Sequence, residues 1–245
     1  IASSHEAMLS KEEFEAISSP SEDSTTYKGR ILEVLDRDFG KGQARLSKRA
    51  GIYAHFFLHG ASFLAPGGRL GLVTSNSWLD VHYGTDIQRF FLERFKIVAI
   101  LESRCERWFE DAAVNVAVTI VEQCSDENLR NANQVRFVGL KRPLTQLVPQ
   151  SRDVASDATR WYAIEQLVSR VEQAPESYED QDIRIRVVRQ EDLWAEGWDE
   201  EEGSYLGAKW GKYIIAPDVY FEVRRRAASR VLPLRKAARI RYGVK

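Results

Sequence analysis

The chain has 245 residues, of which 44% are hydrophobic and 29% are charged, and its formal net charge is −1. These values are typical of a soluble protein with a hydrophobic core, and no apolar run approaches the ~20 residues of a membrane-spanning helix. The N-terminus has no signal-peptide pattern, and Cys105 and Cys124 lack metal-ligand spacing, so we expect a cytoplasmic protein with reduced thiols.

Residues 1–48 form a polar segment with little hydrophobic periodicity. Residues 18–26 are rich in serine and contain a proline, which is typical of a loop. We therefore expect a mobile lead-in over residues 1–48. The chain begins at Ile1 rather than at a methionine, so we also expect it to be a piece of a longer protein.

Residues 49–102 show the pattern of a helix followed by two buried strands with a second helix between them. The apolar face of the first helix is expected at Tyr53, Phe56, Phe57, Gly60, Phe63 and Leu64. Pro66-Gly67-Gly68 ends this helix, and the apolar runs 69–74 and 97–101 are predicted to be strands. Strand, helix and strand with short loops form a βαβ unit, which predicts an α/β sheet.

The sequence LAPGGRLGLVTSNSWL, from Leu64 to Leu79, resembles the middle of the catalytic domain of adenine-N6 DNA methyltransferases. The resemblance is closest to the single-chain, type IIG-like enzymes of restriction-modification systems. It implies an α/β fold, with part of the Rossmann-like sheet of S-adenosylmethionine-dependent methyltransferases, a C-terminal antiparallel hairpin and then a mixed α+β connector. Residues 49–175 would be the C-terminal half of the methyltransferase domain.

The hairpin of this sheet is expected from strand 97–101 and a second strand over residues 114–122, which could pair antiparallel. The resemblance implies that Phe109, in the loop between them, stacks on an adenine that has been rotated out of the duplex. Such a base needs an apolar face to replace the stacking it lost. The alternative is that Trp108 and Phe109 are both core residues at the entrance of a strand.

Other pocket residues are implied by the resemblance. Ile52 and Phe56 match positions on a helix that contacts the adenine ring of the methyl donor, although Gly51 stands where related enzymes have a polar residue. Phe56 could instead be a core residue. Asn76 lies at the carboxyl end of a strand, where open α/β sheets bind ligands. Asn76 and Ser77 could line the base pocket or cap the next helix.

Two parts of the related enzymes are absent from this sequence: the glycine-rich loop that binds the donor and the catalytic Asn-Pro-Pro-Tyr tetrapeptide. We therefore expect no catalytic residue in this chain, and no activity unless an N-terminal catalytic half completes it. His55 and His59 have the i, i+4 spacing of a metal-binding pair but no third ligand, so we predict no metal site.

Residues 176–215 are expected to form an acidic connector that contains tryptophans. Between residues 176 and 202 there are eleven acidic residues against three basic ones. Within this region, residues 182–189 alternate between apolar and polar residues, which predicts a half-buried strand.

Residues 216–245 contain nine basic residues against two acidic ones, which suggests a polyanionic partner. Residues 210–221 resemble the link between the catalytic and target-recognition domains of the same enzymes. We therefore expect a linker helix and the first strand of a recognition domain over residues 216–245. The residues expected to bind DNA are Arg224, Arg225, Arg235 and Lys236.

The resemblance thus implies part of a site-specific methyltransferase that transfers a methyl group from S-adenosylmethionine to adenine N6 in duplex DNA, in restriction-modification or phage defence. The alternative is a non-enzymatic subunit that binds nucleic acid or serves in assembly. A small-molecule methyltransferase is disfavoured by the basic C-terminal segment. No membrane partner is expected.

Overall fold

The computed structural model describes residues 27–42, 46–47, 50–109, 114–150, 157–227, 230–231 and 237. The chain divides into two compact units, Ile1–Ile214 and Ile215–Lys245. Most of the expected lead-in and the expected first strand of a recognition domain lie outside the described residues. In the part of the chain that the structure describes, none of the helices has the length and apolarity that crossing a membrane requires.

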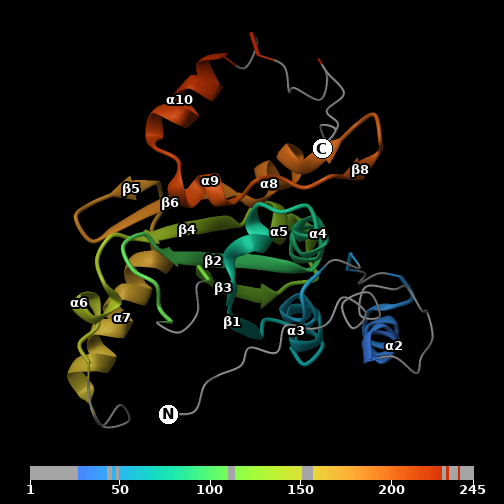
Figure 1. Ribbon diagram of the computed structural model, residues 1–245, viewed down its shortest axis with the longest axis horizontal. Coiled ribbons are helices and arrows are strands. Elements are labelled where there is room, and N and C mark those ends of the chain that lie inside the picture. The colour runs from blue at the N-terminus through green and yellow to red at the C-terminus, as the bar shows by residue number, and fades with distance from the viewer. Residues whose placement is uncertain are drawn as a thin grey trace, which may run out of the picture. The chain divides into compact units, whose positions relative to one another are not determined.

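A six-stranded mixed sheet forms the centre of the first unit (Figure 1). Its strands, in spatial order, are β1 (Arg69–Ser75), β3 (Val116–Gln123), β2 (Phe95–Ser103), β4 (Gln134–Leu140), β6 (Ile183–Arg189) and β5 (Tyr178–Glu179). Both β1 and β2 run antiparallel to β3, so they are parallel to each other. Strand β4 runs parallel to β2, and β6 antiparallel to β4.

The antiparallel hairpin expected after the second strand is confirmed. Strands β2 and β3 pair from Phe95 opposite Gln123 to Glu102 opposite Ala117, with a register shift between Ile97 and Ala99. The predicted βαβ unit is also present, because β1 and β2 are parallel and helix α4 lies between them in sequence. Its two strands are not neighbours, however, since β3 lies between them in the sheet.

Helices occur in both units, and the last of them belongs to the second unit. In chain order they are α2 (Tyr27–Phe39), α3 (Ile52–Ala61), the 3-10 helix η1 (Asn76–Leu79), α4 (Gly84–Arg94), α5 (Glu127–Asn131), α6 (Leu144–Leu147), α7 (Ala158–Glu172), α8 (Gln190–Gly197), α9 (Gly211–Ile215) and α10 (Asp218–Ala227). Helix α3 contacts β1, α4 contacts β2, and α7 contacts β2 and β4. A small second sheet pairs β7 (Trp198–Asp199) with β8 (Ser204–Tyr205).

The core contains two apolar clusters. One cluster consists of aliphatic side chains from β2, β4, β6 and the end of α7, including Ala99, Val138 and Ile185. The other is aromatic, and its rings meet mostly edge to face, as aromatic pairs prefer. The fully buried rings of this cluster are Phe57, Trp78, Phe91, Phe95, Phe137 and Trp210.

The face by which α3 packs differs from the predicted one. The buried residues of α3 are Ala54, His55, Phe57, Leu58 and Ala61. Phe56, which we placed on the apolar face and for which a core position was one of two alternatives, is 53% exposed, and Phe63 is 75% exposed. Small side chains at Ala54 and Ala61 occupy the packed face. The helix also ends at Ala61, so Phe63 and Leu64 of the predicted face lie beyond it.

Residues that we expected in an acidic connector form β5 and β6 of the main sheet and the helix α8. The alternating segment forms β6, which pairs with β4 along its whole length, from Leu140 opposite Ile183 to Gln134 opposite Arg189. The predicted strand is thus confirmed, but its burial does not alternate, since Arg184 is 4% exposed. Sequence reasoning placed it outside the catalytic sheet because its alternation gives no information about its partner strand.

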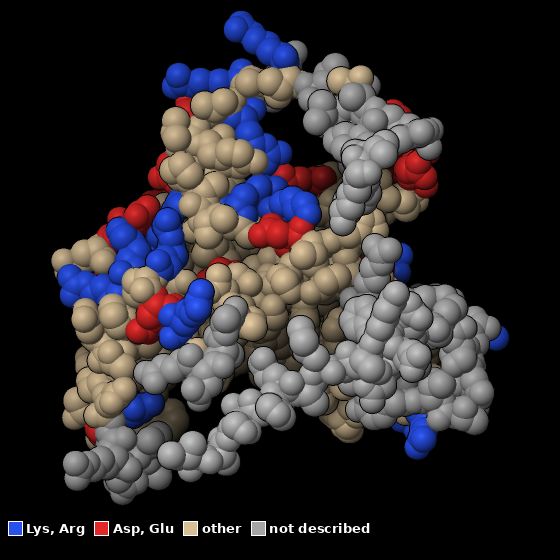
Figure 2. All heavy atoms as spheres, in the orientation of Figure 1, with Lys and Arg blue, Asp and Glu red and all other residues tan. Residues whose placement is uncertain are grey.

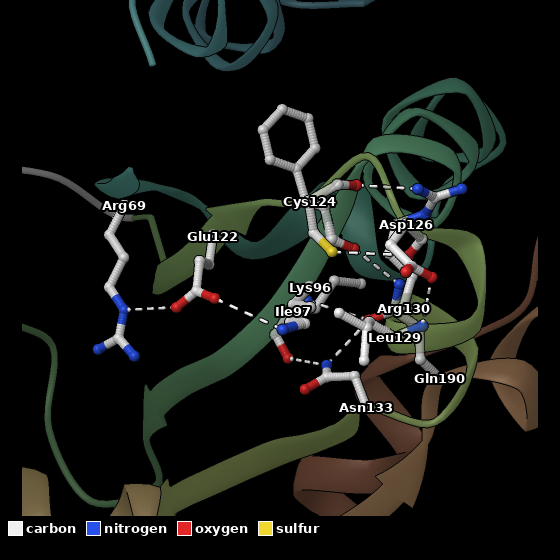
Figure 3. A network of polar contacts seen from close by, with 11 residues as sticks. Arg69, Lys96, Ile97, Glu122, Cys124, Asp126, Leu129, Arg130, Asn133 and Gln190 are labelled. Carbon is white, nitrogen blue, oxygen red and sulfur yellow. Dashed lines mark hydrogen bonds and ion pairs between the residues drawn. The ribbon is translucent and has the colours of Figure 1, made fainter. Parts of the chain in front are cut away.

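Gln190, the first residue of α8, ties this segment to the centre of the sheet (Figure 3). Its Oε1 accepts hydrogen bonds from the Ile97 backbone N–H at 3.0 Å and from Asn133 Nδ2 at 3.0 Å. Its Nε2 donates to the Phe95 carbonyl at 2.7 Å. The side chain is 1% exposed, so these bonds replace water contacts that burial removes.

Gln88 of α4 plays a similar part for the segment that follows β8. Its Oε1 accepts from the Tyr205 hydroxyl at 3.1 Å and from the Ala208 backbone N–H at 3.0 Å. Its Nε2 donates to the Ala208 carbonyl at 2.9 Å. Two buried amides therefore fix residues 190–208 to the rest of the first unit.

We predict that Gln190→Ala lowers the free energy of unfolding by about 1–3 kcal/mol, because it leaves the buried Ile97 N–H and an Asn133 N–H without their shared acceptor. Urea unfolding followed by far-ultraviolet circular dichroism measures the change. Gln166→Ala, on the exposed side of α7, is the matched control and should change stability little. Equal effects of the two substitutions would contradict this role for Gln190.

Candidate functional site

The carboxyl ends of β1 and β2 lie at the same edge of the sheet, because the two strands are parallel. Asn76 directly follows β1, and Glu102 is the second-last residue of β2. The two side chains meet beside the start of β3: Asn76 Nδ2 donates to Glu102 Oε2 at 3.2 Å. The Asn76 backbone N–H donates to the Asn115 carbonyl at 3.0 Å. The edge therefore carries a polar pair held by both strands.

Glu102 is a buried carboxyl, 8% exposed. Burial raises its pKa to about 7, the hydrogen bond from Asn76 opposes that rise, and the negative charge of Asp80 adds to it. In the described part of the chain, Glu102 Oε1 has no hydrogen-bond partner. Near neutral pH this carboxyl is therefore partly protonated, which lets it act as donor or acceptor. Sequence reasoning missed Glu102, and the only signal was an acid directly after the apolar run 97–101.

A group of hydroxyls connects the same edge to α3. The Tyr53 hydroxyl lies 3.1 Å from Ser77 Oγ and 2.9 Å from the Tyr83 hydroxyl. Ser77 Oγ lies 2.8 Å from the Tyr83 hydroxyl and 3.0 Å from Ser75 Oγ. Burial raises the pKa of Tyr53, so its phenol stays protonated. These bonds fix the N-terminal turn of α3 against the end of β1.

The capping role that we considered for Asn76 and Ser77 belongs to their neighbour. Ser75 is the N-cap of η1, and its side chain accepts from the Ser77 backbone N–H at 3.3 Å. A serine at this position satisfies a free backbone donor at the helix start. The Asn76 side chain is turned to Glu102 instead, so the capping alternative for Asn76 is wrong.

Ile52 and Phe56 lie one turn apart on α3 and are exposed, at 57% and 53%. The alternative that Phe56 is a core residue is therefore wrong, since Phe57 takes that place. Gly51, the N-cap of α3, faces the Tyr53 ring, and a Cβ at this position would lie 3.0 Å from the ring. The start of α3 thus presents an exposed apolar surface.

The segment that leaves β2 is anchored at three points. Ser103 Oγ accepts from the backbone N–H groups of Cys105 at 3.3 Å and Glu106 at 3.1 Å. Glu106 Oε1 accepts from the Leu144 backbone N–H at 2.7 Å. Trp108 packs against the aliphatic cluster. The core alternative is therefore correct for Trp108 alone.

Phe109 is the next residue, and it is 51% exposed. The neighbouring Trp108 holds the backbone while the Phe109 ring keeps a free surface. An exposed aromatic ring on an anchored segment has the form of a stacking platform, because it loses little flexibility when a second ring covers it.

The predicted DNA-binding residues belong to the second unit. Arg225 donates to both carboxylate oxygens of Glu222, at 3.1 and 2.8 Å, and the Arg224 guanidinium lies 5.8 Å from the centre of the Tyr220 ring. Arg235 and Lys236 lie outside the described residues. Exposed ion pairs such as Arg225–Glu222 are weak and can be exchanged for other anions.

The two histidines of α3 have separate environments. His55 is buried, and the His59 ring packs against Phe63 at 4.9 Å between ring centres. Over the described ranges of the chain, no three or more histidine, cysteine, aspartate or glutamate side chains are grouped so that they could hold a metal ion.

Comparison with known proteins identifies a related family. Residues 26–109 match the family described as Eco57I restriction-modification methylase. Among solved structures, the type IIG restriction endonuclease BpuSI superimposes with a TM-score of 0.52 at 15% sequence identity, covering 81% of this chain and 20% of BpuSI. A search of curated proteins gives no match.

Subunits of type I restriction-modification systems are also similar. The subunit from Streptococcus thermophilus has a TM-score of 0.46 at 16% identity, covering 76% of this chain and 34% of the subunit. A modification subunit of a putative type I restriction enzyme from Vibrio vulnificus YJ016 has a TM-score of 0.46 at 10% identity, covering 69% of this chain and 33% of the subunit. The chain thus spans between 20% and 34% of the length of these relatives.

The family match confirms the resemblance to restriction-modification methyltransferases. It includes α3, β1, α4 and β2, and so contains Ile52, Phe56, Asn76 and Glu102. The likeness to BpuSI confirms the predicted α/β fold.

We predict that the Glu102 carboxyl makes stability pH-dependent. Its pKa is raised in the folded protein from 4.5 to about 7, so the folded state holds this proton more tightly than the unfolded state. The free energy of unfolding should therefore fall as the pH rises from about 4.5 to 7, by up to about 3 kcal/mol from this group.

Glu102→Gln replaces this titrating carboxyl with an amide that does not titrate. The free energy of unfolding of the variant, relative to that of the unsubstituted chain, should therefore be higher at pH 8 than at pH 5. Urea unfolding at both pH values measures the difference, with the exposed Glu165→Gln on α7 as control. A constant difference between Glu102→Gln and the unsubstituted chain at both pH values would contradict the raised pKa.

Proposed function

We propose that this chain is the C-terminal part of the catalytic domain of a site-specific DNA methyltransferase of a restriction-modification system. Its reaction would transfer a methyl group from S-adenosylmethionine to N6 of adenine in duplex DNA. The observation that carries the proposal is the parallel arrangement of β1 and β2. Both strands end at one edge with the Asn76–Glu102 pair, and an exposed Phe109 follows β2.

The base would be held by Phe109 and Asn76. A base that leaves the duplex loses stacking worth about 1–3 kcal/mol, which an exposed aromatic ring can restore. Asn76 uses one amide hydrogen on Glu102 and keeps a second hydrogen and a carbonyl oxygen for other partners. These are the groups that hydrogen bonds to a base edge require.

The methyl donor would contact Ile52 and Phe56. Their exposed side chains on one side of α3 offer an apolar surface for an adenine ring, and no charged side chain stands between them in the helix sequence Ile52–Ala61. When bound, S-adenosylmethionine supplies an electrophilic methyl group on a positively charged sulfur. Residues outside this sequence would bind the rest of the donor and hold the N6 amine.

The outer edge of β1 supports a division of the domain between this chain and a further segment. Within the described ranges, β1 is an outer strand that hydrogen-bonds only to β3. Val73 on this strand is 52% exposed. An unprotected seven-residue edge invites pairing with another strand. We infer that the N-terminal catalytic half adds to this edge, and that the chain is inactive without it.

The second unit would contact the DNA backbone through Arg224, Arg225, Arg235 and Lys236, as a link to a target-recognition domain. Helix α10 carries three arginines in its last turn. Cationic side chains on an exposed helix provide affinity that does not depend on base sequence. A protein of this kind works where the DNA is, in the cytoplasm.

We predict that Phe109→Ala lowers methyl transfer to N6-adenine by about 5- to 150-fold, the effect of losing one base–aromatic stack. The assay uses the complete methyltransferase that contains this chain, labelled donor and an adenine-containing duplex. Phe63→Ala is the matched control, because Phe63 is an even more exposed phenylalanine on the segment after α3. It should leave the rate unchanged.

Equal rates for both variants would remove Phe109 from the base pocket. If the complete protein transfers no methyl group but binds duplex DNA with steep salt dependence, the alternative is correct, and this chain belongs to a non-enzymatic nucleic-acid-binding subunit.

We predict that Phe56→Ala weakens binding of the donor to the complete protein by about 2- to 10-fold, because it removes one aromatic contact. Equilibrium dialysis with labelled S-adenosylmethionine measures this affinity without DNA. Phe63→Ala again serves as control. Unchanged affinity in Phe56→Ala would exclude α3 from the donor site.

A further inference from the structure

The segment of residues 104–109 separates inward-facing anchors from outward-facing side chains. Glu106 and Trp108 hold it to the protein, as described above. Arg104, Arg107 and Phe109 are exposed. This short segment therefore presents two cations together with the aromatic ring to which we assign the base.

Arg104 has a fixed position on the sheet. Its backbone N–H donates to the Leu140 carbonyl at 2.8 Å. Its side chain lies over Gly139 of β4: a Cβ at Gly139 would lie 2.6 Å from Cδ and 3.1 Å from Cγ of Arg104. A glycine at this position of β4 thus makes room for the aliphatic part of Arg104, and the exposed guanidinium extends from a supported stem.

Cations near the carboxyl end of β4 and near the β5–β6 hairpin are already paired. Lys141 Nζ lies 2.8 Å from Glu179 Oε1, and Arg142 Nε lies 3.1 Å from Asp182 Oδ1. Arg170 Nη2 lies 2.6 Å from Asp180 Oδ2. Figure 2 shows lysine and arginine side chains interspersed with acidic ones on the side of the molecule where the β5–β6 hairpin lies.

Arg104 and Arg107 differ from these paired cations. Over the described ranges, neither guanidinium makes an ion pair or a hydrogen bond. Arg104 acts on Glu179 only at longer range: Lys141 is the first cause of the lowered pKa of Glu179, and Arg184 and then Arg104 add to it. An exposed, unpaired guanidinium on a supported stem is available for an anion from outside the protein.

We propose that Arg104 and Arg107 bind the phosphate groups that flank the base held on Phe109. The inference rests on the function proposed above and adds the residues that hold the strand backbone at the base pocket. Rotating a nucleotide out of a duplex moves its own backbone, so the flanking phosphates need partners at their new positions. Guanidinium groups fit phosphate oxygens in a bidentate manner, and such contacts set register without reading sequence.

The test measures the affinity of the complete methyltransferase for duplex DNA by fluorescence anisotropy over a range of sodium chloride concentrations. Arg104→Gln and Arg107→Gln should each weaken binding to a duplex that contains the recognition sequence, and weaken binding less to a duplex that lacks it, because the base leaves the duplex only at its target. Each should also reduce the slope of log affinity against log salt by about 1, the loss of one phosphate contact. Arg142→Gln, whose arginine is paired with Asp182, is the control and should leave the slope unchanged.

Arg104→Lys keeps the positive charge at this position but removes the planar guanidinium. This variant should retain the salt slope of the unsubstituted protein and only part of its affinity, because lysine cannot bind a phosphate in a bidentate manner. Thermal melting of each variant confirms that it is folded. Salt slopes that stay unchanged in both glutamine variants would overturn the inference. If the salt slopes are unchanged but the unsubstituted protein transfers methyl groups, the proposed function stands and only the phosphate contacts of Arg104 and Arg107 are rejected. If the slopes fall but no variant or parent transfers methyl groups, the phosphate contacts stand and the methyltransferase assignment fails.

Discussion

The pairing of β3 with two strands at once is the constraint on which the rest of this structure depends. Because β3 runs antiparallel to β1 on one side and to β2 on the other, the ends of these two strands coincide at one edge. Asn76 and Glu102 are 26 residues apart in sequence and meet only through this arrangement. The segment of residues 104–109 leaves β2 at the same edge, and we propose that the exposed Phe109 ring contributes to the site there.

Apolar packing and buried polar contacts stabilise that edge in different ways. Apolar clusters supply most of the burial, while a few buried amides determine where the later part of the chain is attached. Gln190 and Gln88 bind backbone groups of α4, β2 and the segment after β8. Such contacts add modest stability when complete, and their geometry excludes other positions for the segment, because an unpaired buried amide is costly.

The sequence allowed β1, β2, β3 and β6 to be predicted well, because each is a short apolar or alternating run. It predicted the face of α3 poorly. Phe56 and Phe57 are adjacent and equally apolar, and only the space available beside β1 and α4 decides which one is buried. The roles of Glu102 and Gln190 were also missed. A single polar residue next to an apolar run does not reveal a partner that lies 26 or 93 residues away.

The attachment of Gln190 to Ile97 has a consequence for how this protein is made. The two residues are 93 positions apart, and β4 gains its outer partner only when β6 pairs with it. On the ribosome, the earlier strands would therefore emerge long before their neighbours and remain open until residue 190 is available. A shortened version ending near residue 175 would keep both strands of the β2–β3 hairpin. It would still lack β6, the outer partner of β4, and helix α8, which carries Gln190. Any dissection of this domain should therefore cut after Ile214, where the first compact unit ends.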